Sequence, residues 1–162
     1  MSALLVVGVD PGQTTGIAAL HFIDGVLDPD LCAVLQTSPL GVLPAVYGLT
    51  ATPRGWRGIR TVPVVAAESF VVGRRASRSR TAQAGETARM ILGALAELQG
   101  VRFVQHPAGA VKPWATDKRI EVAGLAELTT GMRHARDACR HALYAAVHGT
   151  GARDPLSRKE ND

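Results

Sequence analysis

The sequence predicts an α/β protein in which α-helices flank a mixed β-sheet. Three apolar, strand-like runs at residues 4–9, 15–22 and 32–37 are separated by turn residues and indicate an antiparallel meander. Farther along, a strand, a helix and a strand follow one another over residues 62–105, an order typical of a parallel crossover. A sheet that contains both a meander and a crossover has strands of both orientations.

The first half of the chain predicts three strands and one short helix. The run at 4–9 is continuously apolar, as expected of a central strand covered on both faces. Asp24-Gly25 is a turn sequence between the second and third strands. Ser38 and Pro39 suit the N-cap and the first position of a helix. The apolar residues of that helix follow helical spacing at Leu40, Leu43, Val46 and Tyr47.

The second half predicts two strands and several helices. Residues 62–67 form a buried strand that ends at Glu68, and residues 101–105 form another. Between them we expect a long helix over 81–99, ended by Gly100. Its apolar stripe consists of Met90, Ile91, Leu92, Leu95 and Leu98. The remaining elements are a short one at 111–115 and helices at 116–128 and 133–147.

The composition suits one globular domain. Of the 162 residues, 46% are hydrophobic, enough for a sizeable core. Lysine and arginine number 18 against 14 acidic residues, and the resulting net charge of +4 favours a polyanionic partner. We expect the domain to span residues 1–148 and a flexible tail to follow at 149–162, where glycine, proline and charged residues are frequent.

Neither export nor membrane insertion is indicated. The N-terminus lacks the features of a signal peptide, and no apolar run is long enough to cross a bilayer. Cys32 and Cys139 stand far apart without metal-ligand spacing, so we expect two buried thiols in a reducing compartment. The expected location is the cytoplasm.

Three acidic residues and a histidine occupy positions that suggest a shared site. Asp10 ends the first strand, and Glu68 ends the strand at 62–67. Asp137 lies near the start of the last helix, and His134 precedes it by three residues, so both face the same side. If that helix crosses the ends of the two strands, the four groups converge. Two Mg²⁺ or Mn²⁺ ions about 3.5–4 Å apart would relieve the repulsion between the acids and support in-line attack on a phosphodiester.

Each of these residues also has a purely structural interpretation. Asp10-Pro11-Gly12 is a good turn sequence. Glu68 is compatible with the surface end of a strand, and His134 and Asp137 are compatible with a solvated helix. The functional interpretation therefore depends on the order of the four residues along the chain.

Six segments, in order over nearly the whole chain, match one known family. They are Val7-Gly8-Val9-Asp10-Pro11-Gly12-Gln13-Thr14-Thr15-Gly16, Ala66-Ala67-Glu68-Ser69-Phe70, Gly85-Glu86-Thr87-Ala88-Arg89, Pro107-Ala108-Gly109-Ala110-Val111-Lys112, Asp117-Lys118-Arg119 and His134-Ala135-Arg136-Asp137-Ala138. In these segments the chain resembles the RuvC family of Holliday-junction resolvases, in particular its compact bacterial and phage forms. Some members of that family also have histidine in place of the first acid of the last motif.

The resemblance implies an RNase H-like fold of RuvC type, with a five-stranded mixed sheet flanked by helices. It implies a homodimeric crossover junction endodeoxyribonuclease that cuts four-way junctions by paired symmetric nicks, giving 5′-phosphate and 3′-hydroxyl ends. The implied catalytic and metal-binding residues are Asp10, Glu68, His134 and Asp137, with two Mg²⁺ ions for which Mn²⁺ can substitute. The implied setting is the cytoplasm of a bacterium or a phage-infected cell.

Two groups of side chains are expected to contact DNA. The resemblance implies that Lys112 and Lys118 bind phosphates beside the scissile bond and that Phe70 stacks on a base, although core packing also suits Phe70. The basic cluster has a solvated loop as its alternative, but the clustering of its arginines favours binding to the DNA backbone. It consists of Arg74, Arg75, Arg78 and Arg80.

Three other functions are alternatives to a resolvase. A flap or fork nuclease of the same fold would use the same acids and metals, so only substrate competition separates it from a resolvase. The turn at 10–16 also resembles the phosphate turn of actin-like ATPases and sugar kinases, but those proteins need two such domains and this chain is too short. The third alternative is a non-catalytic junction-binding module. The presence of all four candidate ligands argues against it, because a module that only binds has no need to concentrate acids on a basic DNA-binding face.

Overall fold

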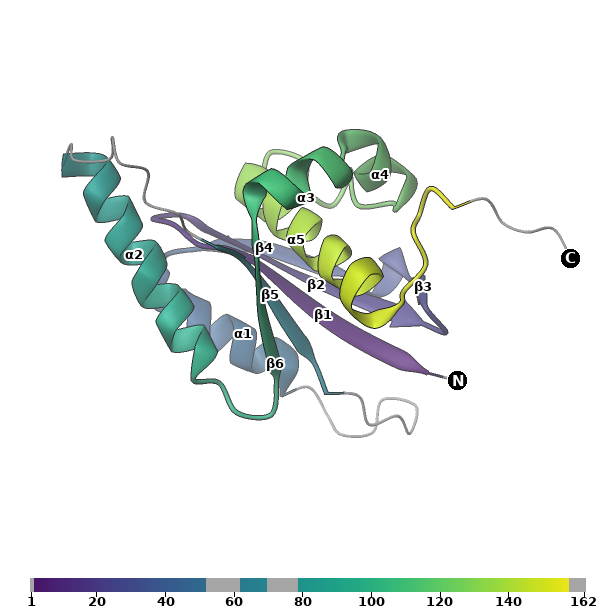
Figure 1. The fold of residues 1–162 in the computed structure, drawn as a ribbon, viewed down its shortest axis with the longest axis horizontal. Coiled ribbons are helices and arrows are strands. Elements are labelled where there is room, and N and C mark those ends of the chain that lie inside the picture. Colours follow the sequence, from purple (N-terminus) through teal and green to yellow (C-terminus); the bar gives the residue numbers. More distant parts are fainter. Residues whose placement is uncertain (1, 52–61, 70–78, 158–162) are drawn as a thin grey trace, which may run out of the picture.

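A computed structural model describes residues 2–51, 62–69 and 79–157 of the chain (Figure 1). The strands are β1 (Ala3–Asp10), β2 (Thr15–Ile23), β3 (Val26–Leu27), β4 (Ala33–Thr37), β5 (Val64–Ser69) and β6 (Arg102–Pro107). The helices are α1 (Val42–Thr50), α2 (Ser79–Ala96), α3 (Ala108–Trp114), α4 (Asp117–Val122) and α5 (Arg133–Thr150). Two short 3-10 helices are η1 (Pro29–Leu31) and η2 (Pro39–Gly41).

The strands form one mixed sheet in the order β3-β2-β1-β5-β6, and β4 also pairs with β2. The pairs β1–β2 and β2–β4 are antiparallel, whereas β1–β5 and β5–β6 are parallel. The predicted meander and the predicted crossover through α2 are therefore both confirmed. All five expected strands are present. A sixth, the two-residue β3, follows a turn in which Asp24 and Gly25 have positive φ, as a tight hairpin requires.

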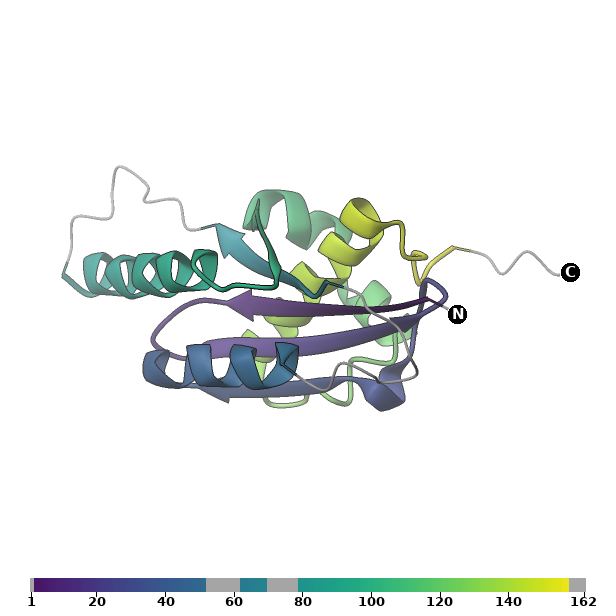
Figure 2. The same ribbon diagram turned by 90° about the horizontal axis from the view of Figure 1, so that it is seen from below.

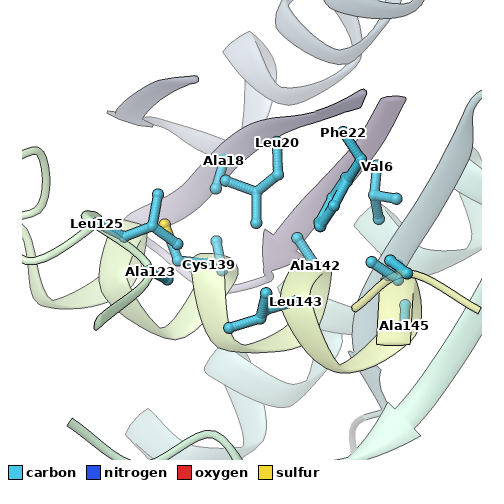
Figure 3. Close-up of a cluster of buried hydrophobic side chains, with 14 of the residues drawn as sticks. Val6, Ala18, Leu20, Phe22, Ala123, Leu125, Cys139, Ala142, Leu143 and Ala145 are labelled. Atoms are coloured by element: carbon cyan, nitrogen blue, oxygen red, sulfur yellow. The ribbon is translucent and has the colours of Figure 1, made fainter. Parts of the chain in front are cut away.

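Each face of the sheet is covered by helices. Figure 1 shows α5, with α3 and α4, on one face and α1 and α2 on the other. Successive residues of β1 point to opposite faces: Val6 packs in the cluster with α5, and Val7 packs in the cluster with α1 and α2. In Figure 3, Cys139, Ala142 and Leu143 of α5 lie against side chains of β1 and β2. Burial on both faces explains why the first strand is continuously apolar.

Two glycines let α5 lie directly on the sheet. A Cβ added at Gly8 would lie 2.0 Å from the carbonyl oxygen of Ala138, and one added at Gly16 would lie 2.0 Å from that of His134. Neither strand could carry a side chain there without moving the helix. Because Gly16 is paired with Asp10 in the sheet, this close approach places the first turn of α5 beside that carboxylate.

The predicted apolar face of α1 is confirmed at Val46 and is wrong at Leu40, Leu43 and Tyr47, which are exposed. Val42 and Val46 are the buried residues of this helix, whereas Leu40 is 91% exposed and Tyr47 is 67% exposed. Residues 39–41 form a 3-10 turn, and the α-helix begins only at Val42, so Leu40 does not share its helical register. The Ser38 side chain makes no cap hydrogen bond. The true stripe therefore starts two residues later than expected.

Other differences concern helix packing and helix ends. In α2, Ile91, Leu92 and Leu95 are buried as predicted, but Met90 is 64% exposed. The helix expected over 116–128 ends at Val122, because Gly124 adopts a φ of +73°.

The last helix is longer than predicted, and the segment after it is held in place. Helix α5 runs to Thr150, three residues beyond the expected end. The following Ala152 is buried, and both carboxylate oxygens of Asp154 accept from the Arg119 guanidinium. The start of this segment lies near the N-terminus (Figure 2), since Ala152 lines a pocket together with Ser2 and Ala3. These contacts lie inside the stretch predicted to be a flexible tail; residues 158–162 lie outside the described residues.

The two thiols are free, and the described helices are not membrane spans. Cys139 is buried, which raises its pKa to about 12, whereas Cys32 is only partly buried. None of the helices that the structure describes combines the length and apolarity needed to cross a bilayer.

Candidate active site

The four predicted site residues line one pocket at the end of the sheet. Strands β1 and β5 run parallel and side by side, so Asp10 and Glu68 emerge at the same edge. Helix α5 packs against both strands and contributes His134 and Asp137. The pocket has a volume of about 460 Å³ and is lined by Asp10, Pro11, Glu68, Lys112, Arg133, His134, Asp137 and Arg140. The predicted convergence is what the structure shows.

Asp10 is paired with His134. The imidazole Nδ1 lies 2.7 Å from Oδ2 of Asp10. Burial raises the pKa of Asp10, the hydrogen bond from His134 opposes this rise, and the charges of Glu68 and Asp137 add to it. The backbone N–H of His134 donates to Oε1 of Gln36 on β4 at 3.0 Å, which satisfies a free donor at the helix start and fixes this residue.

Glu68 is paired with a second histidine. Nε2 of His141 lies 3.3 Å from Oε2 of Glu68, and Nζ of Lys112 lies 4.0 Å from the same oxygen. The hydrogen bond from His141 lowers the pKa of Glu68 and outweighs the opposing effect of burial. Glu68 is therefore an ionised carboxylate at neutral pH.

Asp137 is held by two basic side chains. Burial acts to raise the pKa of Asp137. The hydrogen bonds and positive charges of Lys112 and Arg140 together lower this pKa by more than burial raises it, so the net shift is downward. Nζ of Lys112 lies 3.1 Å from Oδ2, and the Arg140 guanidinium donates to Oδ1. The same guanidinium also donates to Asp117 and to the carbonyl oxygen of Ala115, which ties α5 to the segment around α3 and α4.

The donor types of the pocket fit a divalent cation, although in this structure basic side chains of the protein neutralise Glu68 and Asp137. Carboxylate oxygens suit Mg²⁺ and Mn²⁺, and the pKa of Asp10 responds to the two other acids. Within the described ranges, however, no three histidine, cysteine or acidic side chains are grouped closely enough to hold a metal ion. The ammonium of Lys112 bridges Glu68 and Asp137. A metal bound by both acids would displace it.

The predicted DNA contacts have different outcomes. Lys112 lines the pocket, but it is bound to acids there. Lys118 is not part of the pocket lining, and its Nζ lies 3.7 Å from Glu121. Arg80 belongs to the first turn of α2, but its side chain lies outside the described part of the chain. Phe70, Arg74, Arg75 and Arg78 lie outside the described residues, so their roles stay predictions.

Four site residues were not anticipated from the sequence. Arg140 and His141 follow Asp137 by three and four residues, so helical periodicity could have placed both beside it. Arg133, which directly precedes His134, lines the pocket rim, and in the part of the chain that the structure describes it makes no ion pair. Gln36 reaches His134 across 98 residues of sequence, and no local pattern indicates such a contact.

Together, the antiparallel opening, the parallel crossover and the acids at the ends of β1 and β5 under a C-terminal helix make this an RNase H-like fold. Among solved structures, the chain is similar to RuvC of Thermus thermophilus. It matches T. thermophilus RuvC in complex with a Holliday junction substrate with a TM-score of 0.56 and 21% identity, covering 94% of this chain and 99% of that chain. A second T. thermophilus RuvC structure matches with a TM-score of 0.57 and 20% identity, covering 94% and 100%.

No protein-family model and no curated protein matches the sequence. The likeness is therefore one of structure, and it confirms the predicted RuvC-type fold.

Proposed function

We propose that the protein is a metal-dependent endonuclease that resolves four-way DNA junctions. As a homodimer it makes paired symmetric nicks and leaves 5′-phosphate and 3′-hydroxyl ends. The observation that carries the proposal is the convergence of Asp10, Glu68, His134 and Asp137 in one pocket of a RuvC-type fold. One active site in each of two protomers suits a two-fold symmetric junction.

The same four residues would hold Mg²⁺, or Mn²⁺ in its place, with two ions in each site. When bound, the ions supply an activated water and stabilise the leaving oxygen. The three carboxylates contribute the negative charge, and His134 contributes a neutral donor that adds none. Lys112 bridges two of these acids at distances of 3.1 and 4.0 Å, so its ammonium would become available to a phosphate oxygen if a cation took its place.

Arg133 is the side chain that we assign to the incoming phosphate backbone. It is exposed at the rim of the pocket, at the first residue of α5. The two other basic residues of the lining, Lys112 and Arg140, are engaged with Asp137. Among the described residues of the lining, Arg133 thus supplies positive charge not already committed to an acid, and charge of that kind drives binding to phosphates.

A second candidate function is junction binding without cleavage. It is favoured by one observation: the three acids each have a basic or imidazole partner within the protein. Such a module needs no metal. A flap or fork nuclease of the same fold is the remaining alternative, and it differs only in substrate.

A cleavage assay separates these functions. Purified protein is mixed with a labelled four-way junction, a fork or a linear duplex, each with Mg²⁺, Mn²⁺ or chelator. Paired, ligatable nicks on the junction that require metal are expected. Equal or faster cutting of the fork would make the protein a broader branch nuclease. Tight junction binding without cleavage under any metal condition would support the binding module.

A further inference from the structure

The face of α5 that meets the pocket carries a third functional position, His141. It follows His134 by seven residues and Asp137 by four, so the three side chains share one side of the helix. Each imidazole of this face meets an acid at the end of a parallel strand. His134 meets Asp10 of β1, and His141 meets Glu68 of β5.

The environment of His141 does not favour an imidazole for packing alone. The side chain is fully buried, and its neighbours on α5 include the core residues Ala138 and Ala142. Burial of a polar ring costs free energy unless hydrogen bonds compensate it. Nε2 has one partner, Oε2 of Glu68, and Nδ1 has no hydrogen-bond partner within the part of the chain that the structure describes. The contact with Glu68 is therefore the feature that an apolar side chain could not replace.

The two ring nitrogens also fix the proton arrangement. With its hydrogen on Nε2, a neutral ring donates to the carboxylate and leaves a single acceptor, Nδ1, unpaired. The opposite tautomer would face the carboxylate with a lone pair and would bury an unpaired N–H. The first arrangement is the one that the geometry favours.

We propose that His141 is a positioning residue for Glu68, an inference that rests on the proposed function. Its Nε2–H donates to Oε2 and holds the carboxylate in the pocket, so that the other oxygen would remain available to a divalent cation. Glu68 has one more rotatable bond than an aspartate, and its side chain is 24% exposed, so a fixed donor is needed to keep it oriented. Hydrogen bonds of this kind to metal ligands are worth about 10–100-fold in metal affinity.

The first test uses the metal-free wild-type chain. Side-chain ¹⁵N NMR of the histidines reports which ring nitrogen carries the hydrogen, and a Glu68→Gln variant assigns the signal that responds. We expect Nε2 of His141 to carry a hydrogen and its signal to shift in that variant. A ring protonated at Nδ1 only, or one indifferent to Glu68→Gln, would overturn the proposal. This arm needs neither cleavage nor a variant of His141, so its outcome is independent of whether the protein is a nuclease.

The second test compares three variants for Mn²⁺ affinity, junction binding in chelator and cleavage. His141→Leu keeps apolar volume without the donor, His141→Gln keeps an N–H donor, and His148→Leu removes an exposed imidazole from the same helix outside the pocket. We expect His141→Leu to weaken Mn²⁺ binding about 10–100-fold with junction binding unchanged, His141→Gln to recover part of the loss, and His148→Leu to match the wild type.

Wild-type Mn²⁺ affinity in His141→Leu, even with a lower Tm, would make His141 a packing residue. Equal loss in the Gln and Leu variants would also contradict the proposal. A wild-type chain that neither binds Mn²⁺ nor cuts DNA would instead remove the proposed function, while the NMR result would still decide whether His141 donates to Glu68.

Discussion

The two acid–histidine pairs of the pocket are built alike and behave differently. In each, a carboxylate at the end of a parallel strand meets an imidazole from α5. In the Asp10 pair the acid is the more buried partner, with its side chain 13% exposed against 33% for His134, and burial raises the pKa of the acid. In the Glu68 pair the histidine is the buried partner, and its hydrogen bond lowers the pKa of the acid.

This difference shows which part of each pair the fold stabilises. Burial and two neighbouring acids disfavour the ionised form of Asp10, so the folded chain holds that charge at a cost in stability. Glu68 is ionised at a gain, because its partner is positioned to donate. A cation bound between them would lower the cost at Asp10 most.

The largest effect on cleavage is expected from removing the charge of either acid, and it should be similar for the two pairs. Asp10→Asn and Glu68→Gln should each reduce junction cleavage on the order of a thousandfold, because each removes a charge that stabilises the reacting phosphate through the cation. Junction binding in chelator should stay close to that of the wild type. Cleavage rates and gel-shift affinities measured on the same samples check this. Full activity in either variant would remove that acid from the site.

Gly16→Ala should disrupt the Asp10–His134 pair and leave the Glu68–His141 pair less affected. The new Cβ would lie 2.0 Å from the His134 carbonyl oxygen, so the first turn of α5 must move away from Asp10. We expect a loss of about 1–3 kcal/mol in the free energy of unfolding and a large loss of cleavage. Gly93→Ala, whose Cβ would meet nothing within 4 Å on α2, is the control and should be neutral or stabilising. Equal stability of the two variants by denaturant unfolding would contradict the close packing.

Arg133→Gln tests a residue outside both pairs. Junction binding should weaken several-fold, and the slope of log affinity against log salt should fall by about one, since one phosphate contact is lost. The control is Arg102→Gln, the same change of charge at the opposite end of the parallel strands. If the two variants show the same salt slope, Arg133 is not a specific phosphate contact.

The smallest expected effect is on thermal stability, measured in chelator, where substitution of Asp10 and of Glu68 should shift Tm in opposite directions. The folded pKa of Asp10 is raised, so its ionisation costs stability as pH rises above its normal pKa, and Asp10→Asn should raise Tm at pH 7. The folded pKa of Glu68 is lowered, so its stabilisation is present at pH 7 and is lost as pH falls through that pKa; Glu68→Gln should lower Tm. Shifts of a few degrees are expected, about 1 kcal/mol at this chain length. Both differences should shrink toward acidic pH, and shifts of the same sign would erase the distinction.

Much of this arrangement was predictable from the sequence because strand ends and helix periodicity are local patterns. Asp10 and Glu68 could be placed at strand ends, and His134 and Asp137 on one helix face, without knowledge of the tertiary structure. The partners of these residues were less accessible. Lys112 has a side chain that could equally face DNA, and only packing shows that it bridges Glu68 and Asp137. The prediction of the apolar face of α1 was incomplete for a different reason. A 3-10 turn at residues 39–41 precedes the α-helix, so Leu40 does not share the helical register.

A calorimetric titration of Mn²⁺ into the DNA-free protein tests whether Asp10, Glu68 and Asp137 form a metal site. We expect saturable binding to the wild type, loss of that binding in Asp10→Asn, and tighter binding in Lys112→Gln, which removes the competing ammonium. No saturable binding to the wild type, or the same affinity in the wild type and Asp10→Asn, would contradict a metal site at these acids and would favour the junction-binding module.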